Sequence, residues 1–244
     1  MSASRSHFSP RLAEHVRACR VGDQMIFLDL HRSKYVGVGG PRLDALSAAL
    51  LDGPADDDSP IAPPDPDLLD EWSRHLRHHH LLSDASSAEL ERKPPRLPDP
   101  IAGLTSSDDD GVVASDWRHL VRLWQASFIS AQWLRRRSLA EVANRVIALR
   151  PHHSIQIDDR SAQAMGAAAA SYMRLRPFAL STQDRCLHDS LALIHFLAHR
   201  GLFPHWVIGV RVRPFGAHSW VQSGGVVLND LPEHVRCYEP ILVV

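Results

Sequence analysis

A helix pattern that begins close to Cys186 constrains this chain more than any other stretch of its sequence. Apolar residues recur at helical spacing after the cysteine and stop at Gly201, a residue type that commonly follows a helix end. The residues of this pattern are Leu187, Leu191, Ile194 and Leu197. Because 181–184 offers several N-cap residues, Cys186 should lie in or near the first turn, where free N–H groups and the helix dipole favour a thiolate. Arg185 adds a neighbouring cation.

Two β-rich runs follow this helix, at 206–212 and 217–221, and turn residues between them predict a hairpin. His218 lies at the start of the second run. A further predicted strand covers 226–230 and ends at Asp230. A thiol, an imidazole and an orienting carboxylate are what the activation of a nucleophile requires. We therefore predict a catalytic set of Cys186, His218 and Asp230.

The cysteine, the Ala-His-Ser-Trp-Val segment at 217–221 and the aspartate resemble the core of the transglutaminase-like, papain-related cysteine protease superfamily. Within it, the pattern is most similar to the leader peptidases, or B proteins, of lasso-peptide biosynthesis. The resemblance covers about residues 113–244 and implies a papain/transglutaminase-like α+β domain there. It also implies that the protein cleaves the leader from a ribosomally made precursor peptide.

The resemblance assigns a role to each residue of the set. The thiolate of Cys186 attacks the carbonyl at the leader–core junction, His218 transfers the proton, and Asp230 holds the imidazole ring. The N–H of Cys186 is one expected oxyanion donor; the second is not assigned, and Gln183 and Asp184 are candidates for its vicinity. The freed core would pass to an asparagine-synthetase-like lasso cyclase. No cofactor and no metal are expected.

The first part of the chain is expected to be β-rich and then helical. Alternating apolar residues predict strands at 16–21, 24–30 and 35–38, while helix patterns begin at Pro41 and cover 67–82. The predicted strands are separated by turn-forming residues, as in antiparallel hairpins. This arrangement gives a small three-stranded sheet followed by helices.

The stretch 22–35 resembles the PqqD-like leader-recognition element of ribosomal-peptide biosynthesis. The resemblance implies a small winged-helix-like domain over 1–84 that binds an extended leader at its sheet edge, beside the last helix. The residues expected to contact the leader are Leu28, Tyr35, Val36, Val38, Trp72 and Leu76. The chain departs from that family at 56–60, where an acidic, proline-ending run replaces the middle helix. The alternative is a purely structural hairpin with two helices.

A linker is expected over 85–112, because this stretch is rich in serine, proline and aspartate. The second domain, 113–244, should begin with helices. Ser138 and Glu141 have the spacing of a capping box, and 161–175 is an alanine-rich helix pattern. An apolar stripe at helical spacing is expected to be core, and it consists of Trp117, Leu120, Val121, Trp124 and Phe128.

Composition narrows the class of protein further. The net charge is −1, with 27 basic and 28 acidic residues, so nothing favours nucleic acid or a membrane surface as a partner. The N-terminus has no apolar signal region, and no run approaches the ~18 apolar residues of a spanning helix. Three cysteines are too few for a disulfide framework. We therefore expect a cytoplasmic protein with reduced thiols.

Three alternatives remain at this point. His195 and His199 have the spacing of two zinc ligands on a helix, but Phe196 stands where a zinc protease has its glutamate. A thiol–imidazole pair could also form a thioester and transfer the acyl group to an amine, as transglutaminases do. The third alternative is a peptide-binding module without catalytic activity.

Overall fold

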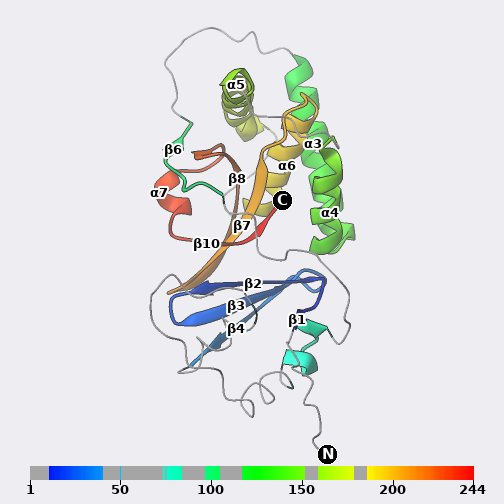
Figure 1. Cartoon of the computed structure of the whole chain (residues 1–244). Helices are drawn as coiled ribbons and strands as arrows, with labels where there is room; N and C mark the ends of the chain where they lie inside the picture. Colours follow the sequence, from blue (N-terminus) through cyan, green and yellow to red (C-terminus); the bar gives the residue numbers. More distant parts are fainter. Residues whose placement is uncertain are drawn as a thin grey trace, which may run out of the picture. The chain divides into compact units, whose positions relative to one another are not determined.

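The computed structural model describes residues 11–40, 50, 74, 76–83, 97–104, 117–151, 159–178 and 186–244. The chain divides into two compact units, Met1–Lys93 and Pro94–Val244, and Figure 1 shows the elements of each. Both units contain strands and helices, which confirms the mixed α+β class. Among the described residues, no helix has the length and apolar character needed to cross a bilayer.

The first unit contains an antiparallel sheet with the strand order β2-β3-β4. Its strands are β2 (Val16–Val21), β3 (Gln24–Asp29) and β4 (Lys34–Gly39). All three predicted strands are thereby confirmed: β2 has the predicted bounds, and the ends of β3 and β4 shift by at most one residue. Gly22 joins β2 to β3 with φ +58°, a left-handed conformation that favours glycine.

A second, two-stranded sheet in this unit pairs β1 (Arg11–Leu12) with β5 (Leu82–Ser83). The predicted helix over 67–82 therefore ends before Leu82. Its described part ends at His78, and the turn that follows places His80 at φ 58°. The predicted helix from Pro41 lies outside the described residues, apart from Leu50. The sheet core includes Val16, Met25, Phe27 and Leu81.

The second unit is built on a five-stranded sheet with the order β10-β7-β8-β9-β6. Its strands are β6 (Ala102–Gly103), β7 (His205–Val212), β8 (Phe215–Ser223), β9 (Val226–Val227) and β10 (Glu239–Val243). The predicted hairpin is β7–β8, and β10 pairs with the other edge of β7. The segment expected to be a linker contributes β6, which pairs with β9 in parallel. The predicted strand over 226–230 is shorter, because only its first two residues are in β9.

Helices cover this sheet. They are α3 (Trp117–Arg136), α4 (Leu139–Leu149), α5 (Asp159–Leu175), the 3₁₀ turn η1 (Arg176–Phe178), α6 (Cys186–Ala198) and the short α7 (Pro232–Val235). The helix pattern after Cys186 is confirmed, and so is the capping box of Ser138 and Glu141. Every residue of α6 from His188 to Leu197 is buried, because α3, α5, β7 and β8 all pack against it (Figure 1). A helix that is apolar on all sides needs such cover.

The expectation that the aromatic stripe of α3 forms core is wrong. Trp117 is 67% exposed and Phe128 is 66% exposed, and Val121 and Trp124 are exposed as well. The buried face of α3 consists instead of Leu123, Ala126, Ser127 and Ser130. Three of these four side chains are small, so α3 can approach α6 closely, which a row of tryptophans would prevent.

This assignment of the two faces predicts a clear difference between two truncations in α3. Leu123→Ala should lower the free energy of unfolding by about 2–5 kcal/mol, because it opens a cavity at a fully buried position. Phe128→Ala, the matched control on the exposed face, should change it by no more than about 0.5 kcal/mol. Urea unfolding monitored by circular dichroism measures both. Equal losses would show that the stripe is packed after all.

Candidate active site

Cys186 is the first residue of α6 and is half-buried. Burial acts to raise the pKa of its thiol, but hydrogen bonding with His218 and the charge of that ring lower it. Backbone hydrogen bonds from Ser219 and Leu187 act in the same direction, so the pKa of Cys186 is lowered overall. The first turn of α6 and the strand that carries His218 therefore favour a thiolate together, as expected for a nucleophile.

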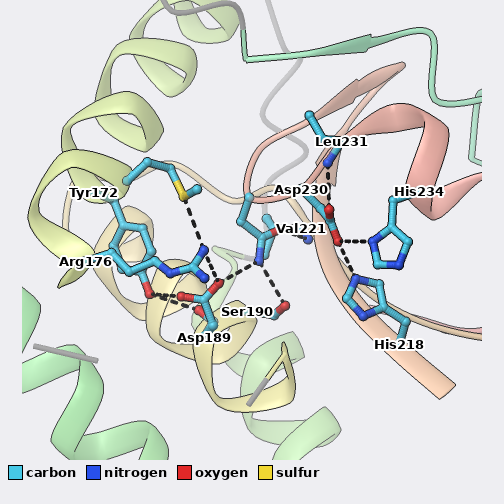
Figure 2. A network of polar contacts seen from close by, with 11 residues as sticks. Tyr172, Arg176, Asp189, Ser190, His218, Val221, Asp230, Leu231 and His234 are labelled. Atoms are coloured by element: carbon cyan, nitrogen blue, oxygen red, sulfur yellow. Dashed lines mark hydrogen bonds and ion pairs between the residues drawn. The ribbon is translucent and has the colours of Figure 1, made fainter. Parts of the chain in front are cut away.

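His218 lies on β8 and is mostly buried. Its Nε2 is 2.5 Å from Oδ2 of Asp230, which leaves Nδ1 as the ring nitrogen available to Cys186 (Figure 2). Burial acts to lower the pKa of His218, but its hydrogen bonds with Asp230 and Cys186, and the charges of both, raise it to about 9. Near neutral pH the ring of His218 is therefore an imidazolium, and its charge favours the thiolate form of Cys186.

Asp230 follows β9 and accepts three hydrogen bonds. Its Oδ2 accepts from His218 and lies 3.0 Å from Nδ1 of His234, and its Oδ1 accepts from the N–H of Leu231 at 2.7 Å (Figure 2). Burial acts to raise the pKa of Asp230, but these hydrogen bonds, with that of His218 the largest, lower it. Asp230 is thus a fixed carboxylate that can orient the imidazole and stabilise its cation.

Aromatic rings surround His218. Its ring centroid is 4.7 Å from that of His234, 5.2 Å from that of Tyr238 and 6.1 Å from that of Trp220. Gly209 pairs with His218 across the β7–β8 hairpin, and a Cβ there would lie 2.7 Å from the Trp220 ring. Only glycine fits at this position, so the absence of a side chain on β7 makes room for the rings that pack around the imidazole.

The structure brings together the three residues predicted from the sequence. It adds His234, Gly209 and the backbone of Ser219, which were not predicted. His234 carried one signal, a spacing of four residues from Asp230, which is also common on helices without any site. Gly209 carried another, since an isolated glycine within an apolar strand often marks a close approach. The backbone of Ser219 offers no signal in a sequence. Gln183 and Asp184, the expected neighbours of an oxyanion, lie outside the described residues.

A second polar cluster lies on α6, one turn beyond the cysteine. Asp189 Oδ1 accepts from the hydroxyl of Tyr172 at 2.9 Å, and its Oδ2 is 3.3 Å from Nη1 of Arg176 (Figure 2). The same Oδ2 accepts from the side-chain amide of Asn229 at 3.2 Å. Asp189, Tyr172 and Asn229 are buried and Arg176 is partly exposed, and none of the four was assigned a role from the sequence.

The ligand-type atoms of His218, Asp230 and His234 all lie within 4.8 Å of one another, and no other such group of three occurs among the described residues. Hydrogen bonds between these same atoms account for the cluster without an ion. His195 is buried against the ring of Trp133, and burial lowers its pKa to about 4. The expected absence of a metal stays a prediction.

The structure places five of the six residues predicted to contact a leader. Leu28 and Leu76 are buried in the first unit, with relative exposures of 0% and 1%. Tyr35, Val36 and Val38 lie on β4, an edge strand of the three-stranded sheet. Trp72 lies outside the described residues. Contact with a leader stays a prediction for all six.

Residues 126–243 match the Transglutaminase-like superfamily, and this span includes all three residues of the candidate site. The second unit therefore contains a transglutaminase-like domain. A stretch of 47 residues is 53% identical to the Microcin J25-processing protein McjB of Escherichia coli. This stretch covers 19% of the chain and 23% of the length of McjB. No solved structure matches the chain.

The contact between Cys186 and His218 predicts how the rate at which iodoacetamide alkylates Cys186 changes with pH. His218→Ala should move the inflection of its alkylation rate upward, toward about pH 8.5, because the hydrogen bond and the cation that lower the pKa are lost. Asp230→Asn should give a smaller upward shift. Mass spectrometry of the Cys186 peptide measures the rate, and the exposed Cys237 serves as an internal control for the reagent. Identical profiles for Cys186 in the wild type and His218→Ala would show that the pair does not exist.

Proposed function

We propose that this protein is a cysteine protease that cleaves the leader from a ribosomally made precursor peptide during lasso-peptide maturation. The observation that carries the proposal is a hydrogen-bonded series that begins with Cys186 at the start of α6 and continues through His218 to Asp230. The transglutaminase-like match over 126–243 supports the class of chemistry. The identity with a microcin-processing protein, although it covers a small part of either chain, supports the class of substrate.

In the first half-reaction, the thiolate of Cys186 attacks the carbonyl carbon at the leader–core junction. The carbonyl oxygen gains the negative charge, and the N–H of Cys186 is the expected donor to it. The imidazolium of His218 then gives its proton to the leaving nitrogen, the peptide bond breaks, and the leader remains as a thioester. The amine of the core peptide leaves with its proton.

In the second half-reaction, neutral His218 takes a proton from water, and the hydroxide formed attacks the thioester. The leader leaves as a carboxylic acid, and the thiolate and the imidazolium are restored. General acid–base catalysis of this kind contributes about 10²–10⁴-fold in rate. Asp230 keeps Nε2 of the ring turned away from the sulfur, so that Nδ1 performs each proton transfer.

The first unit is the proposed leader-binding part. Its edge strand β4 presents main-chain hydrogen-bonding groups, and an extended peptide can add to such an edge as a further strand. Tyr35 and Val36 on β4 are partly exposed, so their side chains can contact an added strand. Leu76 is buried, and we assign it to the support of this surface. The freed core then passes to an asparagine-synthetase-like cyclase.

A second candidate function is acyl transfer, which the transglutaminase-like match also supports. The steps are the same up to the thioester, which an amine then attacks in place of water. The product is a new amide, and no carboxylic acid forms. Product mass separates the two reactions, because hydrolysis splits one peptide whereas transfer joins two molecules.

Cys186→Ala should abolish leader cleavage and leave leader binding intact, because chemistry and capture are assigned to different units. The assay incubates the protein with a precursor peptide encoded beside its gene and follows the products by mass spectrometry. Cys19→Ala and Cys237→Ala are the matched controls and should stay active. Cleavage by Cys186→Ala at the wild-type rate would contradict the assignment of the nucleophile.

Division of the chain after Lys93, at the boundary between the two units, should separate binding from cleavage. The first piece should bind a fluorescent leader peptide with an affinity near that of the intact protein, as measured by polarisation. The second should cleave poorly alone, since it lacks the tether that raises the local concentration of substrate. Addition of the first piece should restore part of the rate. If the second piece alone binds the leader as tightly as the intact chain, the first unit is not the recognition domain.

A further inference from the structure

The side-chain amide of Asn229 joins the helix and the strand that carry the reacting groups. Its Oδ1 accepts from the N–H of Val221 at 2.8 Å, and Val221 belongs to β8. Its Nδ2 donates to Oδ2 of Asp189 and to Oγ of Ser190, both at 3.2 Å, and these two residues belong to α6. All four residues are buried, so water does not compete for these bonds.

This amide bridge is close to every member of the candidate site. Asp189 is three residues after Cys186, one turn of helix or about 5 Å along α6. Val221 is three residues after His218, which is about 10 Å along β8. Asn229 itself precedes Asp230 in the chain. A movement of α6 against β8 would therefore change the bridge and the thiol–imidazole contact together.

The orientation of the amide is fixed by its neighbours. A carboxylate only accepts, so the NH₂ of Asn229 must face Asp189, and a backbone N–H only donates, so the carbonyl oxygen must face Val221. Asp189 is held in turn by the hydroxyl of Tyr172 and by Arg176 (Figure 2). A rotated amide would leave two buried groups without partners, which is costly.

We propose that Asn229 and Asp189 are positioning residues that hold the start of α6 against β8, so that the sulfur of Cys186 meets the imidazole of His218. They touch neither substrate nor reacting atoms. The inference rests on the proposed function, because it concerns the geometry of the same thiol–imidazole pair. A purely structural role would lower stability without changing the state of the thiol in the folded protein.

The test measures the pH profile of Cys186 alkylation by iodoacetamide in three forms of the full chain. Asn229→Asp places two carboxylates 3.2 Å apart, so α6 should be pushed from β8 and the thiol should lose its partner. Its alkylation rate at pH 6 should fall about tenfold or more, which corresponds to a pKa rise of about one unit. The double variant Asp189→Asn/Asn229→Asp exchanges the carboxylate and the amide. It should regain most of the rate, because the new carboxylate still accepts from Val221 and the new amide donates to it.

Gln222→Glu is the matched control, because it also replaces a buried amide by a carboxylate, in this case on β8. Gln222 donates to the carbonyls of Pro98 and Gly224 at 2.8 and 2.7 Å and accepts from the indole N–H of Trp220 at 3.0 Å, and these three partners lie outside α6. This variant should melt at a lower temperature and keep the wild-type alkylation profile. Asn229→Ser removes the bridge without adding charge and replaces Asn229→Asp should that variant not fold.

Two outcomes overturn the inference in different ways. If Cys186 of the wild type has the alkylation profile of an ordinary thiol, the thiolate–imidazolium pair does not exist, and the proposed function is contradicted as well. The positioning role alone is overturned if folded Asn229→Asp or Asn229→Ser keeps the wild-type alkylation profile. It is also overturned if Cys186 in the exchange variant is alkylated as slowly as in Asn229→Asp. The expected result is an upward shift in the single variants, recovery in the exchange variant and no shift in Gln222→Glu.

Discussion

The hydrogen bond between His218 and Asp230 is the interaction on which the rest of the site depends. Burial opposes the charge on both groups, and each is stabilised by the other. With the carboxylate fixed by the N–H of Leu231, the ring presents its second nitrogen to the thiol. The cation so formed lowers the pKa of Cys186. Without Asp230, a half-buried imidazole would tend to be neutral, and the thiol would keep its proton.

Most polar side chains of α6 lie near its start, and His195 is the exception in the remainder of the helix, where burial lowers its pKa to about 4. Residues 191–197 are covered by helices and the sheet, and most of them are apolar. The first turn is where a helix leaves N–H groups without intrahelical partners, so it can hold an anion. The fold thereby places Cys186, the proposed nucleophile, at the end of α6 where a negative charge is tolerated, next to the strand that carries His218.

The sequence was sufficient for the elements that depend on local pattern. Alternating apolar residues predicted the β-hairpins, and the helical spacing of apolar residues after Cys186 predicted α6 with Cys186 in its first turn. The chain order of thiol, imidazole and carboxylate was enough to select three side chains that the fold brings together. The faces of α3 could not be decided in this way, because small residues such as Ala126 determine how closely two helices pack, whereas hydrophobicity favours Trp124. Asn229 was missed because its role depends on contacts between distant segments.

Asp189, which is buried, and Asp230, which is partly buried, have different tasks because their partners differ. Asp230 is paired with the imidazole of His218, which gives up and regains a proton in the proposed reaction. Asp189 is paired with an amide, a guanidinium and the hydroxyl of Tyr172, whose pKa burial and the carboxylate itself raise well above its usual value. The amide does not titrate, and the raised pKa of Tyr172 keeps its hydroxyl protonated near neutral pH. A support that must stay constant while the neighbouring thiol and imidazole exchange protons needs partners of this kind, and the network of Asp189 and Asn229 provides them.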